Sequence, residues 1–299
     1  MPLIGLGEIA ATITSLSWAW SNRIHTAIAL RIGGVNVTAV RAPLYVAATG
    51  VVALLLGGPF SMPSGALVYL VISGLFGLAI CDSLLYVGSV LVGSRIALLM
   101  QSLSACITAI LGYLFLGESI NLMCGLGIVT ATCGVAFVLM EGGLQIENRT
   151  VPRRQLVRGV TITFISALFL SASFLLLKQA LLFGVHPAWA VFVRMSTGLS
   201  MLWIALLFTG TLLPVLKRAW TDWSIVSMLL FGATVATAGN CLAAVAMKYT
   251  TAGIAATLIG LQPVMIILIN TVLDRKLPTL RTVIGTCIAF SGAAMIFLR

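Results

Sequence analysis

Long runs of apolar residues, separated by short polar turns, are the dominant pattern along this chain. A helix that crosses a bilayer needs about 20 apolar residues, because each residue advances about 1.5 Å through roughly 30 Å of hydrocarbon. Ten runs meet this length, at residues 8–30, 35–56, 65–88, 93–116, 121–140, 157–183, 187–209, 224–247, 251–273 and 279–298. The pattern predicts an all-α polytopic membrane protein with ten transmembrane helices.

One longer polar stretch, residues 141–158, divides the ten runs into two groups of five and contains four arginines. We therefore predict a first five-helix repeat over residues 1–140, a basic cytoplasmic linker over 141–158, and a second five-helix repeat over 159–299.

The two groups match when one is shifted along the other. A shift of 153 residues lays Arg41 on Arg194, and a shift of 158 lays Asp82 on Asn240. The second shift also pairs glycines: Gly74 with Gly232, Gly127 with Gly285 and Gly134 with Gly292. Because five spans is an odd number, the second copy must enter the membrane from the opposite face. Such inverted repeats enclose a site near the bilayer midplane in secondary transporters.

Basic residues favour one side of the predicted topology. Loops after the odd-numbered helices carry Arg31, Arg95, Arg149, Arg153, Arg154, Arg158, Lys217, Arg218, Arg275, Lys276 and Arg281. The opposite side carries Lys248 and Arg299. The positive-inside rule then predicts cytoplasmic odd loops, with both termini on the other side of the membrane.

Composition excludes several classes of protein. Hydrophobic residues make up 60% of the chain and charged residues 8%, whereas a soluble domain is about 25% charged. The net charge of +10 is spread thinly, without the aromatic interleaving of a nucleic-acid-binding surface. The six cysteines form no CxxC pair, so we expect no metal or other cofactor.

Asp82 is the only acid well inside a predicted span. Because an ionisable group in the membrane costs several kcal/mol unless it faces a cavity or a partner, two interpretations are open. Asp82 is either a cavity carboxylate that binds a cationic group or a coupling proton, or a structural carboxylate held by Ser83 or Arg95.

Arg41 and Arg194 occupy matching places near the starts of the second and seventh helices. A guanidinium binds a substrate carboxylate or phosphate through two parallel hydrogen bonds. The alternative is a side chain that extends to the membrane surface.

Other polar residues also interrupt the apolar runs. The further candidates for lining a cavity are Trp18, Asn22, Tyr86, Gln101, Asn240 and Gln262. Their hydrogen bonds serve either a ligand or neighbouring helices, at about 0.6 kcal/mol each. Pro263 removes a backbone hydrogen bond and is a predicted hinge. Lys178 is a candidate gate or interface residue, His25 a hydrogen-bonded helper, and Glu118 an anchor for its loop rather than a substrate contact.

Several segments of the first half resemble the EamA domain of the drug/metabolite transporter superfamily. They read GLAICDSLLY at 77–86, GSRIALL at 93–99 and LGESI at 116–120. In the second half GIAA at 253–256 and LQPV at 261–264 fit the same pattern, but LDRKL at 273–277 replaces the acidic LGExL motif. The resemblance implies a ten-helix multi-pass transporter of a bacterial inner membrane. Ten-helix members of the superfamily are often drawn with cytoplasmic termini, whereas the basic loops of this chain predict that both termini are periplasmic.

These features together predict a secondary transporter, with export as the expected direction, of a small metabolite such as an amino acid. The alternatives are a flippase for a lipid or lipid-linked metabolite and a non-transporting membrane scaffold. An enzyme is not expected, because no nucleophile, base or metal-ligand cluster is present in the sequence. The expected partners are the substrate and membrane lipid, without nucleic acid, and the chain is a monomer or a homodimer.

Overall fold

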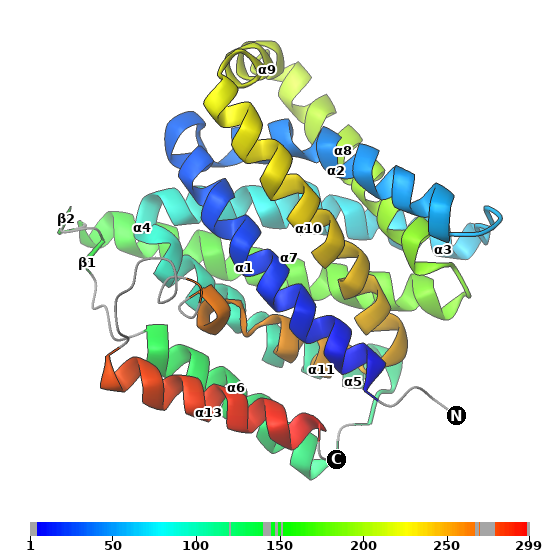
Figure 1. Ribbon diagram of the computed structural model, residues 1–299, viewed down its shortest axis with the longest axis vertical. Helices are drawn as coiled ribbons and strands as arrows, with labels where there is room; N and C mark the ends of the chain where they lie inside the picture. Colours follow the sequence, from blue (N-terminus) through cyan, green and yellow to red (C-terminus); the bar gives the residue numbers. More distant parts are fainter. Residues whose placement is uncertain are drawn as a thin grey trace.

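The computed structural model describes residues 5–119, 121–139, 145–146, 149–150, 152–266, 269 and 279–297. These residues form a bundle of packed helices (Figure 1). The first half contains α1 (Leu6–Ile32), α2 (Gly34–Leu56), α3 (Ser64–Gly74), η1 (Leu75–Asp82), α4 (Ser83–Ser102), α5 (Ser104–Leu116) and α6 (Leu122–Leu139). The second contains α7 (Arg153–Leu182), α8 (Pro187–Phe208), α9 (Leu212–Thr221), α10 (Trp223–Tyr249), α11 (Ala252–Ile259) and α13 (Leu280–Phe297). The all-α prediction is confirmed.

Six helical stretches are long and apolar enough to cross a membrane, judged by length and composition alone. They are Gly34–Leu56, Gly65–Gly93, Ile96–Leu116, Arg153–Leu182, Pro187–Phe208 and Trp223–Tyr249. Three shorter apolar helices accompany them at Leu122–Phe137, Ala252–Ile266 and Leu280–Ile296. Helix α1 has 27 residues but is not among these six. The chain is therefore a polytopic membrane protein.

Two features of the connections were not predicted. Residues 212–221 form the short helix α9, where only a loop was expected. In the segment predicted as a linker, β1 (Gln145–Ile146) pairs antiparallel with β2 (Arg149–Thr150), and α7 already begins at Arg153. The apolar pattern does not detect α9, β1 or β2, because none of the three is an apolar run of membrane length.

The ends of the helices define two faces of the bundle. The terminal face is where α1 begins and α13 ends, and α5, α7 and α10 also end there (Figure 1). The linker face is the opposite end, with α9 and the β1–β2 hairpin (Figure 1). The two faces provide the frame for locating the polar sites.

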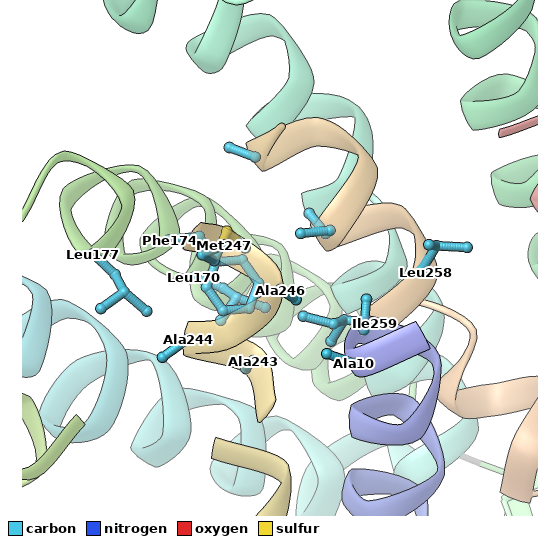
Figure 2. Close-up of a cluster of buried hydrophobic side chains, with 14 of the residues drawn as sticks. Ala10, Leu170, Phe174, Leu177, Ala243, Ala244, Ala246, Met247, Leu258 and Ile259 are labelled. Atoms are coloured by element: carbon cyan, nitrogen blue, oxygen red, sulfur yellow. The ribbon is translucent and has the colours of Figure 1, made fainter. Parts of the chain in front are cut away.

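The buried apolar core lies where the two halves meet. Figure 2 shows buried side chains of α1, α7, α10 and α11 that belong to one apolar cluster, among them Ala10, Phe174, Met247 and Ile259. Each of these four side chains is buried. The core therefore joins α1 of the first half to three helices of the second.

Helices α6 and α13 pack along each other at one edge of the bundle (Figure 1). Small residues allow this close approach: a Cβ on Gly134 would lie 2.4 Å from the backbone N of Ala289. A Cβ on Gly292 would lie 2.3 Å from the backbone N of Ala131. Close backbone approach at small residues is a common way for helices to associate in lipid.

Substituting Gly134 should therefore separate α6 from α13. We expect Gly134→Ala to lower the free energy of unfolding by about 1–3 kcal/mol, the usual cost of overpacking. Gly125→Ala is a matched control in the same helix, because nothing lies within 4 Å of its added Cβ. Unfolding in SDS titrations measures both, and equal stability of the two variants would contradict the packing argument.

Candidate functional site

A polar cavity lies among α1, α2, η1, α4, α7, α8 and α10. It is lined by all nine candidates from the sequence: Trp18, Asn22, Arg41, Asp82, Tyr86, Gln101, Arg194, Asn240 and Gln262. Its open space is small, about 60 Å³, which is room for a few water molecules at about 10–15 Å³ each. The structure thus brings together residues that are up to 244 positions apart, from Trp18 to Gln262. Their role in binding a substrate stays a prediction.

Eight further lining residues were not predicted from the sequence: Ser21, Tyr45, Gly77, Leu78, Leu85, Leu170, Met195 and Ala236. Most are apolar or small, and nothing distinguishes such residues from packing residues in a hydrophobic run. Ser21 and Tyr45 are polar, and their spacing is the one sequence signal that points to them. Ser21 lies three residues after Trp18 and Tyr45 lies four after Arg41, which puts each pair on one helix face.

The strongest electrostatic contact in the cavity joins α2 to η1, where Arg41 Nη2 donates to Asp82 Oδ2. The Arg41 side chain is 4% exposed and the Asp82 side chain 29% exposed. The alternative in which Arg41 extends to the membrane surface is therefore wrong, since the Arg41 side chain is buried and Asp82 holds its guanidinium. Asp82 therefore has a partner that the structural interpretation did not name, and Ser83 Oγ makes no hydrogen bond among the described residues; the side chain of Arg95 lies outside the described residues.

Asp82 ends an unusual segment, since η1 is an eight-residue π-helix between two α-helices. A π-helix closes its hydrogen bonds between residues five apart and is frequent at functional sites. Gly77 and Asp82 are five residues apart in η1, and both line the cavity. The wider turn therefore presents both positions to the same space.

Aromatic rings surround the guanidinium of Arg41. Nη1 donates to Tyr45 Oη at 2.9 Å and Tyr86 Oη at 3.2 Å, and the Arg41 Cζ lies 5.0 and 4.8 Å from the two ring centres. His25 Nδ1 lies 3.3 Å from Nη1 and 3.0 Å from Ser21 Oγ. These contacts hold the cation in place through hydrogen bonds and cation–π attraction.

A chain of hydrogen bonds runs from this pair into the second half of the protein. Tyr86 Oη donates to Asn22 Oδ1 at 2.8 Å, and Asn22 Nδ2 donates to Gln262 Oε1 at 2.7 Å. Arg41, Tyr86, Asn22 and Gln262 therefore form one continuous network across the cavity. A shift of any one of these side chains affects the bonds of the next.

Arg194 occupies the other side of the cavity and is 3% exposed. Its Nη2 donates to Ser173 Oγ at 3.0 Å, while Nε and Nη1 have no hydrogen-bond partner among the described residues. Like Arg41, it is buried and does not extend to the membrane surface as the alternative proposed.

The helix around the predicted hinge is interrupted just before Pro263. α11 ends at Ile259, and a turn at Gly260 and Leu261 precedes a further helical segment at residues 262–266. The first half is interrupted at Leu103, between α4 and α5, which the 158-residue shift pairs with Leu261. Ala105 stands there in place of Pro263, so proline is not required for the break.

A second polar cluster lies at the terminal face, outside the cavity. Lys178 Nζ donates to the Thr250 carbonyl at 2.5 Å and lies 3.6 Å from Glu118 Oε1. Glu118 Oε2 accepts from the backbone N of Ala252 at 2.8 Å, and Thr250 Oγ1 donates to Glu8 Oε1 at 3.1 Å. We call these five residues the terminal-face network; it joins α1 and the end of α5 to α7, α10 and α11.

Comparisons with known proteins extend this description. A solved crystal structure of another protein superposes on this one with a TM-score of 0.74, and the match covers 96% of each chain. The two sequences are only 16% identical, so this similarity concerns the fold alone. No curated protein matches the chain. The model of the EamA-like transporter family matches residues 5–140 and again 157–298. The chain therefore belongs to the EamA-like transporter family.

Proposed function

We propose that the protein is a secondary transporter that moves a small polar metabolite through the central cavity. The observation that carries this proposal is the buried cavity itself, which contains three charged side chains, Arg41, Asp82 and Arg194. Buried charges in a membrane protein are costly and usually mark a substrate or ion pathway. A scaffold would have no need of them.

The proposed architecture is ten spans in two inverted five-helix repeats. Helix packing supports it: α1 packs on α10, and the equivalent α7 packs on α3, η1 and α4. Hydrogen bonds repeat as well. Thr14 of α1 donates to the Gly239 carbonyl, and Ser166 of α7 donates to the carbonyl of Cys81, the position that the 158-residue shift pairs with Gly239.

Interrupted helices on both sides of the cavity add further support. Secondary transporters commonly form their sites from discontinuous helices at the interface between repeats. The breaks at Leu103 and Leu261 are related by the repeat, and Gln101 and Gln262 next to them line the cavity. We infer that these breaks allow the two repeats to move relative to each other.

In this mechanism the terminal-face network closes one entrance of the cavity. It joins Glu8 and Glu118 of the first repeat to Lys178, Thr250 and Ala252 of the second. These contacts must break when the terminal face opens. The linker face must then be closed, so that the cavity is never open to both sides of the membrane at once. Basic residues concentrate on the linker face, so we assign that face to the cytoplasm and the terminal face to the periplasm of a bacterial inner membrane.

Proteoliposomes test the proposal directly. Vesicles loaded with a mixture of amino acids, organic acids, amines and sugars should lose or exchange at least one compound faster with the protein than without it, as measured by mass spectrometry. A fluorescent-lipid assay on the same vesicles tests the flippase alternative. Lipid transfer without metabolite flux would replace the proposed function, and no flux of either kind would reject it.

A further inference from the structure

Among the residues that the structure describes, Asp82 forms an ion pair with Arg41 and no carboxylate does so with Arg194. The repeat shifts lay Arg41 on Arg194 and Asp82 on Asn240. In the first copy the arginine pairs with the acid. In the second copy the acid is replaced by a neutral amide, and both Arg194 and Asn240 line the cavity.

The charge of the cavity is consequently unbalanced. Two of its lining residues are cations, Arg41 and Arg194, and one is an anion, Asp82, so +2 and −1 leave a net charge of +1. Removing an ion from water is costly in a low-dielectric interior unless an opposite charge approaches it. One monovalent anion would neutralise the site.

The donors of Arg194 are only partly satisfied by the protein, and its buried Nε and Nη1 have no acceptor among the described residues. A guanidinium has five N–H donors, and the described residues accept from Nη2 alone, through Ser173. Gly77 makes room for the guanidinium of Arg194, because a Cβ at position 77 would lie 2.4 Å from Arg194 Nη2. A planar carboxylate fits the end of a guanidinium with two parallel hydrogen bonds.

From these observations we infer, on the basis of the proposed function, that the transported substrate is a small organic monoanion whose carboxylate binds Arg194. The substrate carboxylate pairs with Arg194 in the second repeat as Asp82 pairs with Arg41 in the first. Asn240, which lines the same cavity, can donate a further hydrogen bond from its amide. Electroneutrality distinguishes this class from amines and from neutral sugars. The Arg41–Asp82 pair remains intact while the substrate is bound.

Binding is tested by thermal shift of the purified full-length protein in detergent. The probes are acetate, lactate and pyruvate, each with its neutral amide, together with ethylammonium and inorganic phosphate. A ligand that binds the folded state raises its melting temperature. We expect a saturable rise with at least one carboxylate and none with its amide or with ethylammonium.

Three variants locate the site. Arg194→Gln should abolish the carboxylate shift, and Arg194→Lys should raise the apparent Kd about tenfold or more, because a point charge replaces a two-pronged donor. Gly77→Ala keeps the charge but displaces the guanidinium, so it should also weaken binding. Ser200→Ala, on the exposed surface of α8, is the matched control and should bind as the unmodified protein does.

The outcomes separate this inference from the proposed function. Four results would overturn the inference. Two concern the unmodified protein and its carboxylate probes: no thermal shift with any carboxylate, or equal shifts with the acid and its amide. The others are a shift with ethylammonium or phosphate alone, and a carboxylate shift that survives in Arg194→Gln. Flux of a neutral or cationic compound in proteoliposomes would overturn it while leaving the transporter intact. Carboxylate binding without any flux would instead count against transport.

Discussion

Replacing Asp82 by asparagine should reduce transport about tenfold or more while the protein still reaches the membrane. The substitution preserves shape but removes the negative charge that holds Arg41. A hydrogen bond to a charged group contributes about 1.5–3 kcal/mol, and each 1.4 kcal/mol is a factor of ten. The released guanidinium would also disturb Tyr86, and through it Asn22 and Gln262. Initial rates of flux in proteoliposomes measure the effect.

A charge-balanced double variant separates stability from transport. Asp82→Asn alone leaves a buried cation unpaired, which costs about 3–5 kcal/mol. Adding Arg41→Gln removes that cation, so we expect most of the stability to return but not the transport. Full transport in Asp82→Asn would remove the carboxylate from the mechanism. Recovery of transport in the double variant would show that the pair acts only through stability.

Replacing Lys178 by methionine should lower the free energy of unfolding by about 3 kcal/mol, because removing one partner of a buried ion pair leaves the other without compensation. The side chains of Lys178 and Glu118 are each 10% exposed. The Thr250 carbonyl loses its donor as well. Unfolding in SDS measures the loss, and the weakened terminal face should open more often.

Glu118 provides the control for this prediction. Glu118→Gln removes the charge but can retain the hydrogen bond from the backbone N of Ala252, so its cost should be smaller than that of Lys178→Met. The double variant Lys178→Met/Glu118→Gln should lose less free energy of unfolding than the two single variants lose together. The difference, which is the coupling energy of the two side chains, should be about 0.5–3 kcal/mol. Strict additivity would mean that the two side chains do not act together.

The sequence was informative wherever a residue type conflicts with its surroundings. Asp82, Arg41 and Arg194 stand out because a charge in an apolar run needs a partner or a cavity, and all three line the same cavity. The helices were predictable for a similar reason, since only a run of about 20 apolar residues spans the hydrocarbon.

Partners and local backbone geometry were not predictable in this way. The Arg41–Asp82 pair joins residues on different helices, and a single sequence carries no signal that brings them together. The π-helix η1 has an ordinary apolar composition. The break at Leu103 has no proline, so only comparison with its equivalent at Leu261 reveals a common feature of the two repeats.

Glu8 illustrates a further limit. It lies near the start of a predicted helix, where an acid is expected to face water, yet it is 5% exposed and accepts from Thr250. Its place in the terminal-face network depends on how the ends of α1 and α10 meet. That meeting is a property of the packed bundle rather than of the local sequence.

If the two repeats alternate in opening the cavity, the cavity must be accessible from each side of the membrane in turn. The test protein carries a cysteine in place of Ala236, a cavity-lining residue, and has its six native cysteines replaced. A membrane-impermeant maleimide is then applied to either side of sealed, oriented vesicles. We expect labelling from both sides, faster from the terminal face in Lys178→Met, and loss of transport once the cysteine is modified. Labelling from neither side, or full transport by the labelled protein, would contradict this expectation.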